Sequence, residues 1–292
     1  MTSAVQVQEV SRGFRKRAAL RSVTATFPPG SVTALVGSNG AGKTTLLNLV
    51  VGLLTPTTGT ISLFGHLAPG SLEALAKVAY VAQDGPVSTS RSVGDAVRIA
   101  RAFNSSFDYG AAVLRLQRLG IDLRQRVSKL SGGQRSQLAI TLALARAPEL
   151  LVLDEPLSSL DPIARRDLLG ELMGYCVDSG MTIIFSSHVI VELEKIASHL
   201  VLIKDGEAVV AGEIDDLLQR HRIFVGTSAE AGLAYGEHGT VISQSHPLTL
   251  ASRVIRFDDV PVSNAMLTPA TLEDLAYAYL EHTPPGSGEP SK

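Results

Sequence analysis

The sequence has little of several features that would mark other classes of protein. It contains a single cysteine, Cys176, which excludes a disulfide within the chain and fits a reducing compartment. No run reaches the ~18 apolar residues that a membrane-spanning helix needs. The first 17 residues lack the apolar core of a signal peptide. The charge is nearly balanced, with 26 Lys and Arg against 28 Asp and Glu, whereas a nucleic-acid-binding protein would show a basic excess. We therefore expect a soluble cytoplasmic protein without a nucleic-acid partner.

The pattern of apolar residues indicates an α/β fold. The chain has 292 residues and 45% hydrophobic residues, enough for a sizeable core. The apolar runs at 31–37, 149–156 and 181–188 are typical of buried strands, and they alternate with predicted helices, among them 43–54 and 163–180. Such alternation predicts a largely parallel sheet covered by helices on both faces.

The predicted α/β domain covers residues 1–218. Its last strands form a hairpin at 200–212, because Asp205-Gly206 is a dipeptide that tight type I′ turns prefer. A helix is expected over 189–199, after the strand at 181–188.

A small C-terminal domain is predicted over 219–282, followed by a disordered tail at 283–292. Residues 226–247 are small, polar and Gly-rich, so we expect loose loops there, with strands following at 250–262. The segment 268–282 predicts a helix that begins either with Pro269 at its first position or with Thr271 and Asp274 as a capping pair. We expect Leu272, Leu275 and Tyr279 of this helix to pack on the C-terminal domain itself; the alternative is that the helix folds back and stabilises a dimer.

A phosphate-binding loop is the clearest motif. The segment "GSNGAGKT" (37–44) fits G-x-x-x-x-G-K-[ST] in full, and it lies between a predicted strand and a predicted helix. Glycines allow the backbone N–H groups to converge on phosphate oxygens. Lys43 would reach the β and γ phosphates, and the Thr44 hydroxyl is a ligand for Mg²⁺.

Polar residues at the ends of other strands complete a hydrolytic site. Asp154 would hold Mg²⁺, and Glu155 would orient or deprotonate a water aimed at the γ-phosphate. Gln83 would contact Mg²⁺ and sense the γ-phosphate, and His188 would donate to it. Taken singly, Gln83 is more typical of a surface loop, and His188 is more typical of a structural histidine. The set as a whole favours ATP hydrolysis.

A second anion-binding loop, "LSGGQ" (130–134), raises a question. Gly132 and Gly133 directly precede a predicted helix, although glycine is unfavourable within helices. The first N–H groups of a helix point outward and bind anions. One domain with one nucleotide does not need two such loops.

The order of these motifs resembles that of the ATP-binding-cassette (ABC) ATPases over residues 3–218: phosphate loop, Gln83, "LSGGQ", "LLVLDEP", "SSLD" and "SSH". The resemblance implies a P-loop NTPase fold of the ABC ATPase type, with a RecA-like core, a helical signature subdomain at about 85–145 and a small C-terminal α+β extension. It also implies that "LSGGQ" closes over the ATP of a second subunit, so that two chains sandwich two ATP molecules. The residues that it places on ATP in the same chain are Phe14, Gly37, Ser38, Asn39, Gly40, Ala41, Gly42, Lys43, Thr44 and Thr45. Those placed on the partner's ATP are Ser131, Gly132, Gly133, Gln134 and Asp161.

Further assignments follow from the same resemblance. Phe14 would stack on adenine, where Tyr is commoner, and Asp161 would bridge the subunits. Ser159 stands where Gly is frequent and Ser38 where Pro is frequent, and neither departure affects the expected chemistry. Glu155, His188 and Gln83 form the implied catalytic set, and Thr44, Gln83 and Asp154 the Mg²⁺ set. Because this set is intact, we expect real hydrolysis.

The expected role is that of a separate ATPase subunit on the inner face of the cell membrane, driving a permease. The passage 81–100 and the helix "TPATLEDLAYAYL" are similar to those of bacterial ABC-2-type exporter ATPases, which favours export and a homodimer. The alternative is a soluble ABC ATPase that serves translation, repair or regulation. Translation-type members carry two cassettes, repair-type members carry a long coiled coil, and an intact Glu155 disfavours a regulatory module without turnover.

Overall fold

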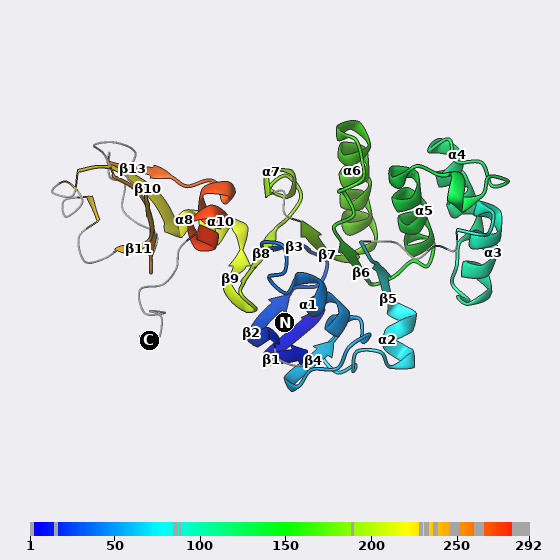
Figure 1. Ribbon diagram of the computed structural model, residues 1–292, viewed down its shortest axis with the longest axis horizontal. Coiled ribbons are helices and arrows are strands. Elements are labelled where there is room, and N and C mark those ends of the chain that lie inside the picture. The colour runs from blue at the N-terminus through cyan, green and yellow to red at the C-terminus, as the bar shows by residue number, and fades with distance from the viewer. Residues whose placement is uncertain are drawn as a thin grey trace.

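The computed structural model describes residues 3–14, 17–83, 87, 89–187, 190–227, 230, 234–235, 239–245, 251–259 and 266–281. Three parts follow one another along the longest axis of the molecule (Figure 1). A sheet with α10 lies at one end, a core with β3, β7 and β8 lies in the middle, and the helices α3, α4 and α5 form the other end.

The core contains a six-stranded sheet in the order β5-β6-β7-β3-β8-β9. Neighbouring strands are parallel except for the β8–β9 hairpin at the edge. The strands are β3 (Val32–Val36), β5 (Val78–Val81), β6 (Leu150–Asp154), β7 (Thr182–Ser187), β8 (His199–Lys204) and β9 (Glu207–Glu213). The predicted hairpin is confirmed, and Asp205 and Gly206 both have positive φ, at 50° and 84°, as a type I′ turn requires.

Alternate residues of the central strands face two different hydrophobic clusters. Ile183 and Phe185 of β7 join the cluster beneath α6 (Pro162–Ser179), whereas Ile184 joins the cluster beneath α1 (Lys43–Val50). Both faces are therefore buried, which explains why these strands read as continuous apolar runs.

A three-stranded antiparallel sheet, β2-β1-β4, shares the second cluster. Its strands are β1 (Val5–Phe14), β2 (Arg17–Phe27) and β4 (Thr58–Leu63). The sequence analysis assigned no strand to 17–27. Irregular register explains this: the β1–β2 pairing shifts between Val10 and Arg12, and Ser22 has φ of 46°, so the buried residues Leu20 and Val23 are three apart rather than two.

The predicted helical subdomain is present and has its own small core. It consists of α3 (Val93–Ala102), α4 (Tyr109–Arg118), the short 3₁₀ helix η1 (Val127–Lys129) and α5 (Gly132–Leu144). Ser92 and Asp95 form a capping box at the start of α3, and Asp108 caps α4. The remaining short helix, α2 (Leu72–Lys77), precedes β5.

The C-terminal region contains a four-stranded antiparallel sheet in the order β11-β12-β10-β13. The elements are α8 (Ile214–Arg220), β10 (His221–Gly226), β11 (Gly239–Ser245), β12 (Ala251–Phe257), β13 (Leu267–Pro269) and α10 (Leu272–Glu281). The expectation of loose loops throughout 226–247 is wrong, because β11 pairs with β12 there. Pro269 lies in β13 rather than at the helix start. The Thr271 and Asp274 pair does cap α10, since each side chain accepts a hydrogen bond from the backbone N–H of the other.

Helix α10 packs on the core that holds the six-stranded sheet as well as on its own sheet, so the expectation that Leu272 and Leu275 pack on the C-terminal domain itself is wrong. Both are fully buried in the cluster that contains Ile190 and Leu193 of α7 (Ile190–Leu193). Tyr279 contacts both parts, and its hydroxyl lies 3.1 Å from Nε2 of His221. Helix α7 is also shorter than expected over 189–199, with turns after Leu193. The tail at 283–292 lies outside the described residues.

Candidate functional site

The phosphate loop lies where β3 ends and α1 begins, as predicted. Two of its glycines are required by close backbone contacts. A Cβ on Gly37 would lie 2.4 Å from the carbonyl oxygen of Ile203. Gly42 has φ of 117°, and a Cβ there would lie 2.6 Å from Cδ2 of Leu20. The loop can therefore keep this curvature only with glycine at both positions.

Lys43 is the first residue of α1, and its ammonium is held over the loop. Nζ donates to the carbonyl oxygens of Gly37 at 2.7 Å and Ser38 at 3.3 Å. It also lies 3.5 Å from Oε1 of Glu155, and both side chains are buried. A cation is thus fixed beside the N-terminus of a helix, where the backbone adds partial positive charge for an anionic ligand.

A cavity of about 500 Å³ opens above this loop. It brings together residues from four separate segments that the sequence analysis had assigned to one site. Its lining is Phe14, Arg17, Ala19, Asn39, Gly40, Gly42, Lys43, Thr44, Thr45, Gln83 and Glu155. Phe14 is 44% exposed, and the guanidinium of Arg12 lies 4.9 Å from the centre of its ring. An exposed aromatic face at the mouth of a phosphate site is suited to stacking on a base. Arg17 is an additional lining residue that the sequence analysis did not identify.

The two acidic residues at the end of β6 are connected through Ser186 on the neighbouring strand β7, by way of the Asp154 carboxylate and the Glu155 backbone. The Ser186 hydroxyl donates to Oδ1 of Asp154 at 2.6 Å and accepts from the backbone N–H of Glu155 at 2.8 Å. Glu155 has φ of 50°, so the chain turns sharply between the two acids. Ser186 was missed by the sequence analysis because its role depends on β6–β7 pairing. It positions the Asp154 carboxylate and the backbone of Glu155 at the carboxyl ends of these strands.

Asp154 fits the expected role of a metal ligand. It is 1% exposed, and its second oxygen, Oδ2, has no hydrogen-bond partner among the described residues. A buried carboxylate oxygen without a hydrogen-bond partner destabilises the fold unless a cation or a water molecule binds it. Burial, with the nearby Asp154 charge as a second cause, raises the pKa of Tyr80 to about 12.

The residues expected to act on a second subunit do not line this cavity. Ser131 caps α5: its hydroxyl accepts from the backbone N–H of Gln134, whose side chain accepts from the N–H of Ser131. Asp161 caps α6 by accepting from the N–H groups of Ile163 and Ala164. Both residues thus have a capping role within their own chain.

The signature helix and the "SSLD" loop are packed closely together. A Cβ on Gly133 would lie 3.0 Å from the carbonyl oxygen of Ser159, and the hydroxyls of Ser136 and Ser159 are 2.7 Å apart. Glycine at 133 therefore also suits a close contact within the chain, which a side chain would crowd. The serine at 159, expected to be without effect, makes a hydrogen bond that glycine could not make.

His188 lies outside the described residues, directly after the end of β7 at Ser187. The structure brings together Phe14, Lys43, Gln83 and Glu155 of the predicted set.

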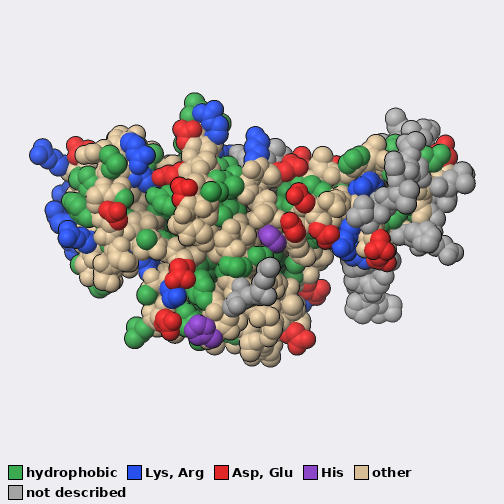
Figure 2. Space-filling view, turned by 180° about the vertical axis from the view of Figure 1, so that it is seen from behind, with side chains coloured by type: hydrophobic (Ala, Val, Ile, Leu, Met, Phe, Trp, Pro, Cys, Tyr) green, Lys and Arg blue, Asp and Glu red, His purple; other side chains and the backbone are tan. Residues whose placement is uncertain are grey.

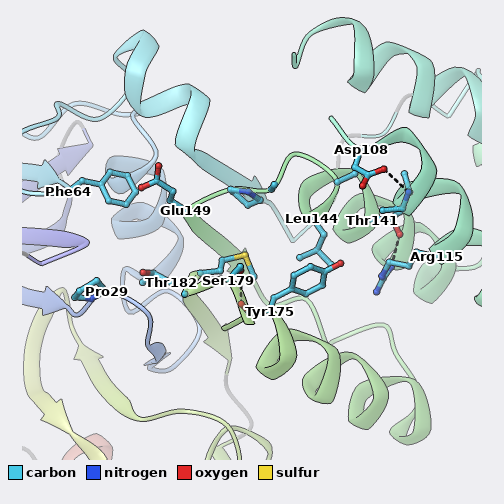
Figure 3. A pocket seen from close by; sticks show the side chains of 17 residues that line it. Pro29, Phe64, Asp108, Arg115, Thr141, Leu144, Glu149, Tyr175, Ser179 and Thr182 are labelled. Carbon is cyan, nitrogen blue, oxygen red and sulfur yellow. Dashed lines mark hydrogen bonds between the residues drawn. The ribbon is translucent and has the colours of Figure 1, made fainter. Parts of the chain in front are cut away.

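A second cavity, of about 540 Å³, lies between the core and the helical subdomain (Figure 3). Its lining includes Glu149 and Met181, which directly precede β6 and β7. The cavity therefore lies at the amino-terminal ends of the parallel strands, whereas Lys43 lies at their carboxyl ends. Arg115 of α4 lies on its wall and is buried. The guanidinium donates to both carboxylate oxygens of Glu171 on α6 and to the backbone oxygen of Gln137 on α5. Among the described residues, its lining includes none of the predicted site residues. Arg115 links the helical subdomain to the core through its bonds to Glu171.

Among the described residues, the helices are too short or too polar to cross a bilayer.

Comparison with known proteins agrees with this geometry. The ABC transporter family matches residues 20–158. The Fe(3+) ions import ATP-binding protein FbpC 2 of Rhodococcus jostii is 39% identical over 194 residues, which are 64% of this chain and 56% of that protein. The Nod factor export ATP-binding protein I of Cupriavidus metallidurans is 32% identical over 227 residues, 75% of this chain and 74% of that protein. A solved structure of an ATP-binding subunit of an ABC transporter superposes with a TM-score of 0.65 at 28% identity, covering 74% of this chain and 92% of that one.

The relatives thus include an importer and an exporter, and both share the cassette. With the phosphate loop, the paired carboxylates and the signature helix in place, these matches show that the chain belongs to the ABC transporter family, as an ATP-binding cassette of the ATP-hydrolysing type.

Proposed function

We propose that this chain is the ATPase subunit of a membrane exporter, and that it drives a separate permease by closing and opening an ATP-sandwich dimer. The observation that carries the hydrolytic part is the arrangement around Ser186, which holds Asp154 and Glu155 at the sheet edge, with Glu155 3.5 Å from Lys43.

The nucleotide would occupy the 500 Å³ cavity. Its adenine would stack on Phe14, and its phosphate oxygens would accept hydrogen bonds from the loop N–H groups and the Lys43 ammonium. Contact with phosphate would replace the carbonyl contacts of Lys43 and would loosen its pairing with Glu155. Glu155 would then be free to accept a proton.

The residues that fit Mg²⁺ are Thr44, Gln83 and Asp154, since hydroxyl, amide and carboxylate oxygens are the ligands that this ion prefers. Bound there, the ion would neutralise charge on the phosphate oxygens. Asp154 supplies an oxygen, Oδ2, that has no hydrogen-bond partner among the described residues.

Hydrolysis needs a base and a phosphate-sensing group. Glu155 would take a proton from a water as the water oxygen bonds to the γ-phosphorus and the bond to ADP breaks. Gln83, from the end of β5, and His188, which follows β7, would organise the γ-phosphate. Ser131, Gly133 and Asp161 would complete the site of the second subunit, probing its γ-phosphate at the N-terminus of α5.

A groove directly behind Gln83 supports coupling to a permease. It is lined by Tyr80 and Ala82 of the core, Val87, and Ala100, Ala139 and Arg146 of the helical subdomain. A segment inserted there would contact both lobes and the residue next to the γ-phosphate sensor. Such a partner would place the chain at the inner face of the membrane, in the cytoplasm.

Export is favoured over import by the C-terminal helix. Its capped "TLEDLAYAYL" segment, similar to that of ABC-2-type exporter ATPases, is part of the ATPase core rather than a loose appendage. We further propose that residues 219–282 act as one small domain fixed to the core through this helix. The cargo is determined by the permease.

The decisive experiment is purification of a tagged Glu155→Gln variant from gently solubilised membranes with ATP present. Loss of the base should trap the closed dimer, so its partners should remain bound. Recovery of a multi-span membrane protein supports the transporter assignment. Recovery of ribosomes, DNA or soluble proteins alone would favour the alternative of a non-transport ABC ATPase.

Two variants test the assignment of the two loops. Lys43→Ala should weaken ATP binding at least tenfold. Ser131→Arg should leave ATP binding intact but abolish hydrolysis, because the side chain would block sandwich closure. Normal turnover in Ser131→Arg would show that the signature loop does not act on a second subunit.

A further inference from the structure

The charge of the molecule is strongly uneven. Residues 89–146, which form the helical subdomain, contain ten Lys and Arg but only three Asp and Glu. The rest of the chain contains sixteen basic and twenty-five acidic residues. Figure 2 shows Lys and Arg side chains concentrated at the end of the molecule that the helical subdomain forms, on the left in that view.

Eight of the ten basic side chains are exposed, and they are Arg91, Arg98, Arg101, Arg118, Arg124, Arg126, Lys129 and Arg135. The exposed acidic side chains of the subdomain are Asp108 and Asp122. Few of these charges are neutralised: within the described part of the chain, Arg98 pairs with Asp95, whereas Arg118, Arg124 and Arg126 form no side-chain ion pair. The surface therefore keeps a positive potential that a partner can use.

Four of these arginines lie at one end of the subdomain. Arg118 is the last residue of α4, and Arg91 lies two residues before α3. The turn after α4 folds back on the start of α3, because the N–H of Gly94 donates to the carbonyl oxygen of Leu123. Ser92 and Arg126 form an antiparallel bridge in the same place. Arg91, Arg118, Arg124 and Arg126 together are named the basic end.

Large apolar side chains are exposed on the same two helices. Ile99 on the solvent face of α3 is 39% exposed, and Phe103, the C-cap residue of α3 at the end away from the basic end, is 84% exposed. Leu114, 55% exposed, lies one turn before Arg118 on the solvent face of α4. None of these side chains serves the core of the subdomain.

We propose that the helical subdomain binds the surface of a bilayer rich in anionic phospholipids, with the basic end on the headgroups and Phe103 at the interface. Basic residues are attracted to anionic leaflets, and exposed aromatic or aliphatic side chains on the same surface insert at the boundary with the acyl chains. Nucleic acid would match the charge as well. It would not use the exposed Ile99, Phe103 and Leu114, and the net charge of −2 for the whole chain opposes it.

This surface extends the proposed function, since a cassette docked on a permease works beside a bilayer. The proposal rests on that function only in taking a membrane as the partner of the basic end. It would fix the tilt of the helical subdomain relative to the membrane. The signature residue Ser131 lies in the same subdomain, two residues after Lys129. Lipid composition would therefore influence how the signature helix meets the second subunit.

Vesicle co-sedimentation of the purified full chain tests the proposal without any permease. The probes are vesicles of equimolar phosphatidylglycerol and phosphatidylcholine, and vesicles of phosphatidylcholine alone. Binding is expected only to the anionic vesicles and should weaken as salt rises. The double variant Arg124→Gln/Arg126→Gln should bind about 25-fold more weakly, at roughly fivefold per charge removed. Phe103→Ser should bind several-fold more weakly.

The matched control is Arg166→Gln/Lys195→Gln, which removes the same charge from exposed positions outside the subdomain. It should bind like the wild type, and basal ATPase activity should be unchanged in all these variants. Equal binding to both kinds of vesicle would overturn the proposal, as would equal losses in the control and the Arg124/Arg126 variant. Binding to duplex DNA or RNA without vesicle binding would also overturn it. The proposed transport function is judged separately, by what co-purifies with Glu155→Gln.

Discussion

Arg115 offers a sharp test of how the helical subdomain is held to the core. Its side chain is 6% exposed, and every N–H group of its guanidinium has an acceptor. The acceptors belong to Gln137 and Thr141 on α5 and to Glu171 on α6. The change Arg115→Met keeps most of the volume and removes all of these bonds.

The expected cost follows from the burial of the partners. Removing one member of a buried ion pair costs about 3–5 kcal/mol, because the other charge loses its compensation. Glu171 is 28% exposed, so water restores part of its solvation. The Gln137 side chain and Thr141 are buried and lose their donor. We therefore expect a loss of about 3 kcal/mol in the free energy of unfolding.

Urea unfolding followed by circular dichroism measures this loss as a lower midpoint. The matched control is Arg118→Met on the same helix, where the side chain is exposed, and it should change stability by no more than about 0.5 kcal/mol. ATP affinity should be unchanged in both variants, since Arg115 does not line the nucleotide cavity. Equal stability of the two variants would refute the view that Arg115 joins the lobes.

Three further predictions concern contacts elsewhere in the fold. A double-mutant cycle with Ser136→Ala, Ser159→Ala and the double variant should show a coupling of about 1 kcal/mol in the free energy of thermal unfolding. If the two single losses of unfolding free energy simply add up in the double variant, the 2.7 Å hydrogen bond is contradicted. Gly42→Ala should lower ATP affinity at least tenfold in a fluorescence titration, because a Cβ would lie 2.6 Å from Cδ2 of Leu20 in a left-handed conformation; unchanged affinity would show that the loop relaxes freely. Burial lowers the pKa of His221 below its usual 6.5, so the unfolded chain binds more protons than the folded one below that pH. Unfolding free energy should therefore fall between pH 7.5 and 5.5, and His221→Phe should reduce that fall; an identical fall in the variant would rule His221 out as its cause.

The relation of the C-terminal helix to the core bears on how the domains move. Leu272 and Leu275 share one hydrophobic cluster with Ile190 and Leu193 of α7, and α7 follows the end of β7. The last helix is therefore packed against the segment that begins just after His188. A shift of α7 would be transmitted to the C-terminal sheet through α10, because Ala278 and Tyr279 of α10 pack on that sheet.

The local features of this protein were decided by the sequence alone. The phosphate loop, the hairpin turn at Asp205-Gly206 and the cap formed by Thr271 and Asp274 each depend on residues within a few positions of one another. Turn and cap preferences arise from backbone conformation and from short-range hydrogen bonds, so they can be read directly. Apolar patterning likewise predicted the parallel sheet, because strands buried on both faces are apolar throughout.

Other features were decided only when distant segments met. The bulge in β2 hid the period of its buried residues, and β11 gained its place by pairing with β12 rather than by its own polar sequence. Ser186 links the Asp154 carboxylate to the Glu155 backbone only because β6 and β7 are neighbours, and Gly133 is closely approached by Ser159. No local preference encodes such contacts, since each depends on the packing of elements far apart in the chain. Short-range chemistry therefore identified the motifs of this ATPase, whereas tertiary packing determined how those motifs are oriented and joined.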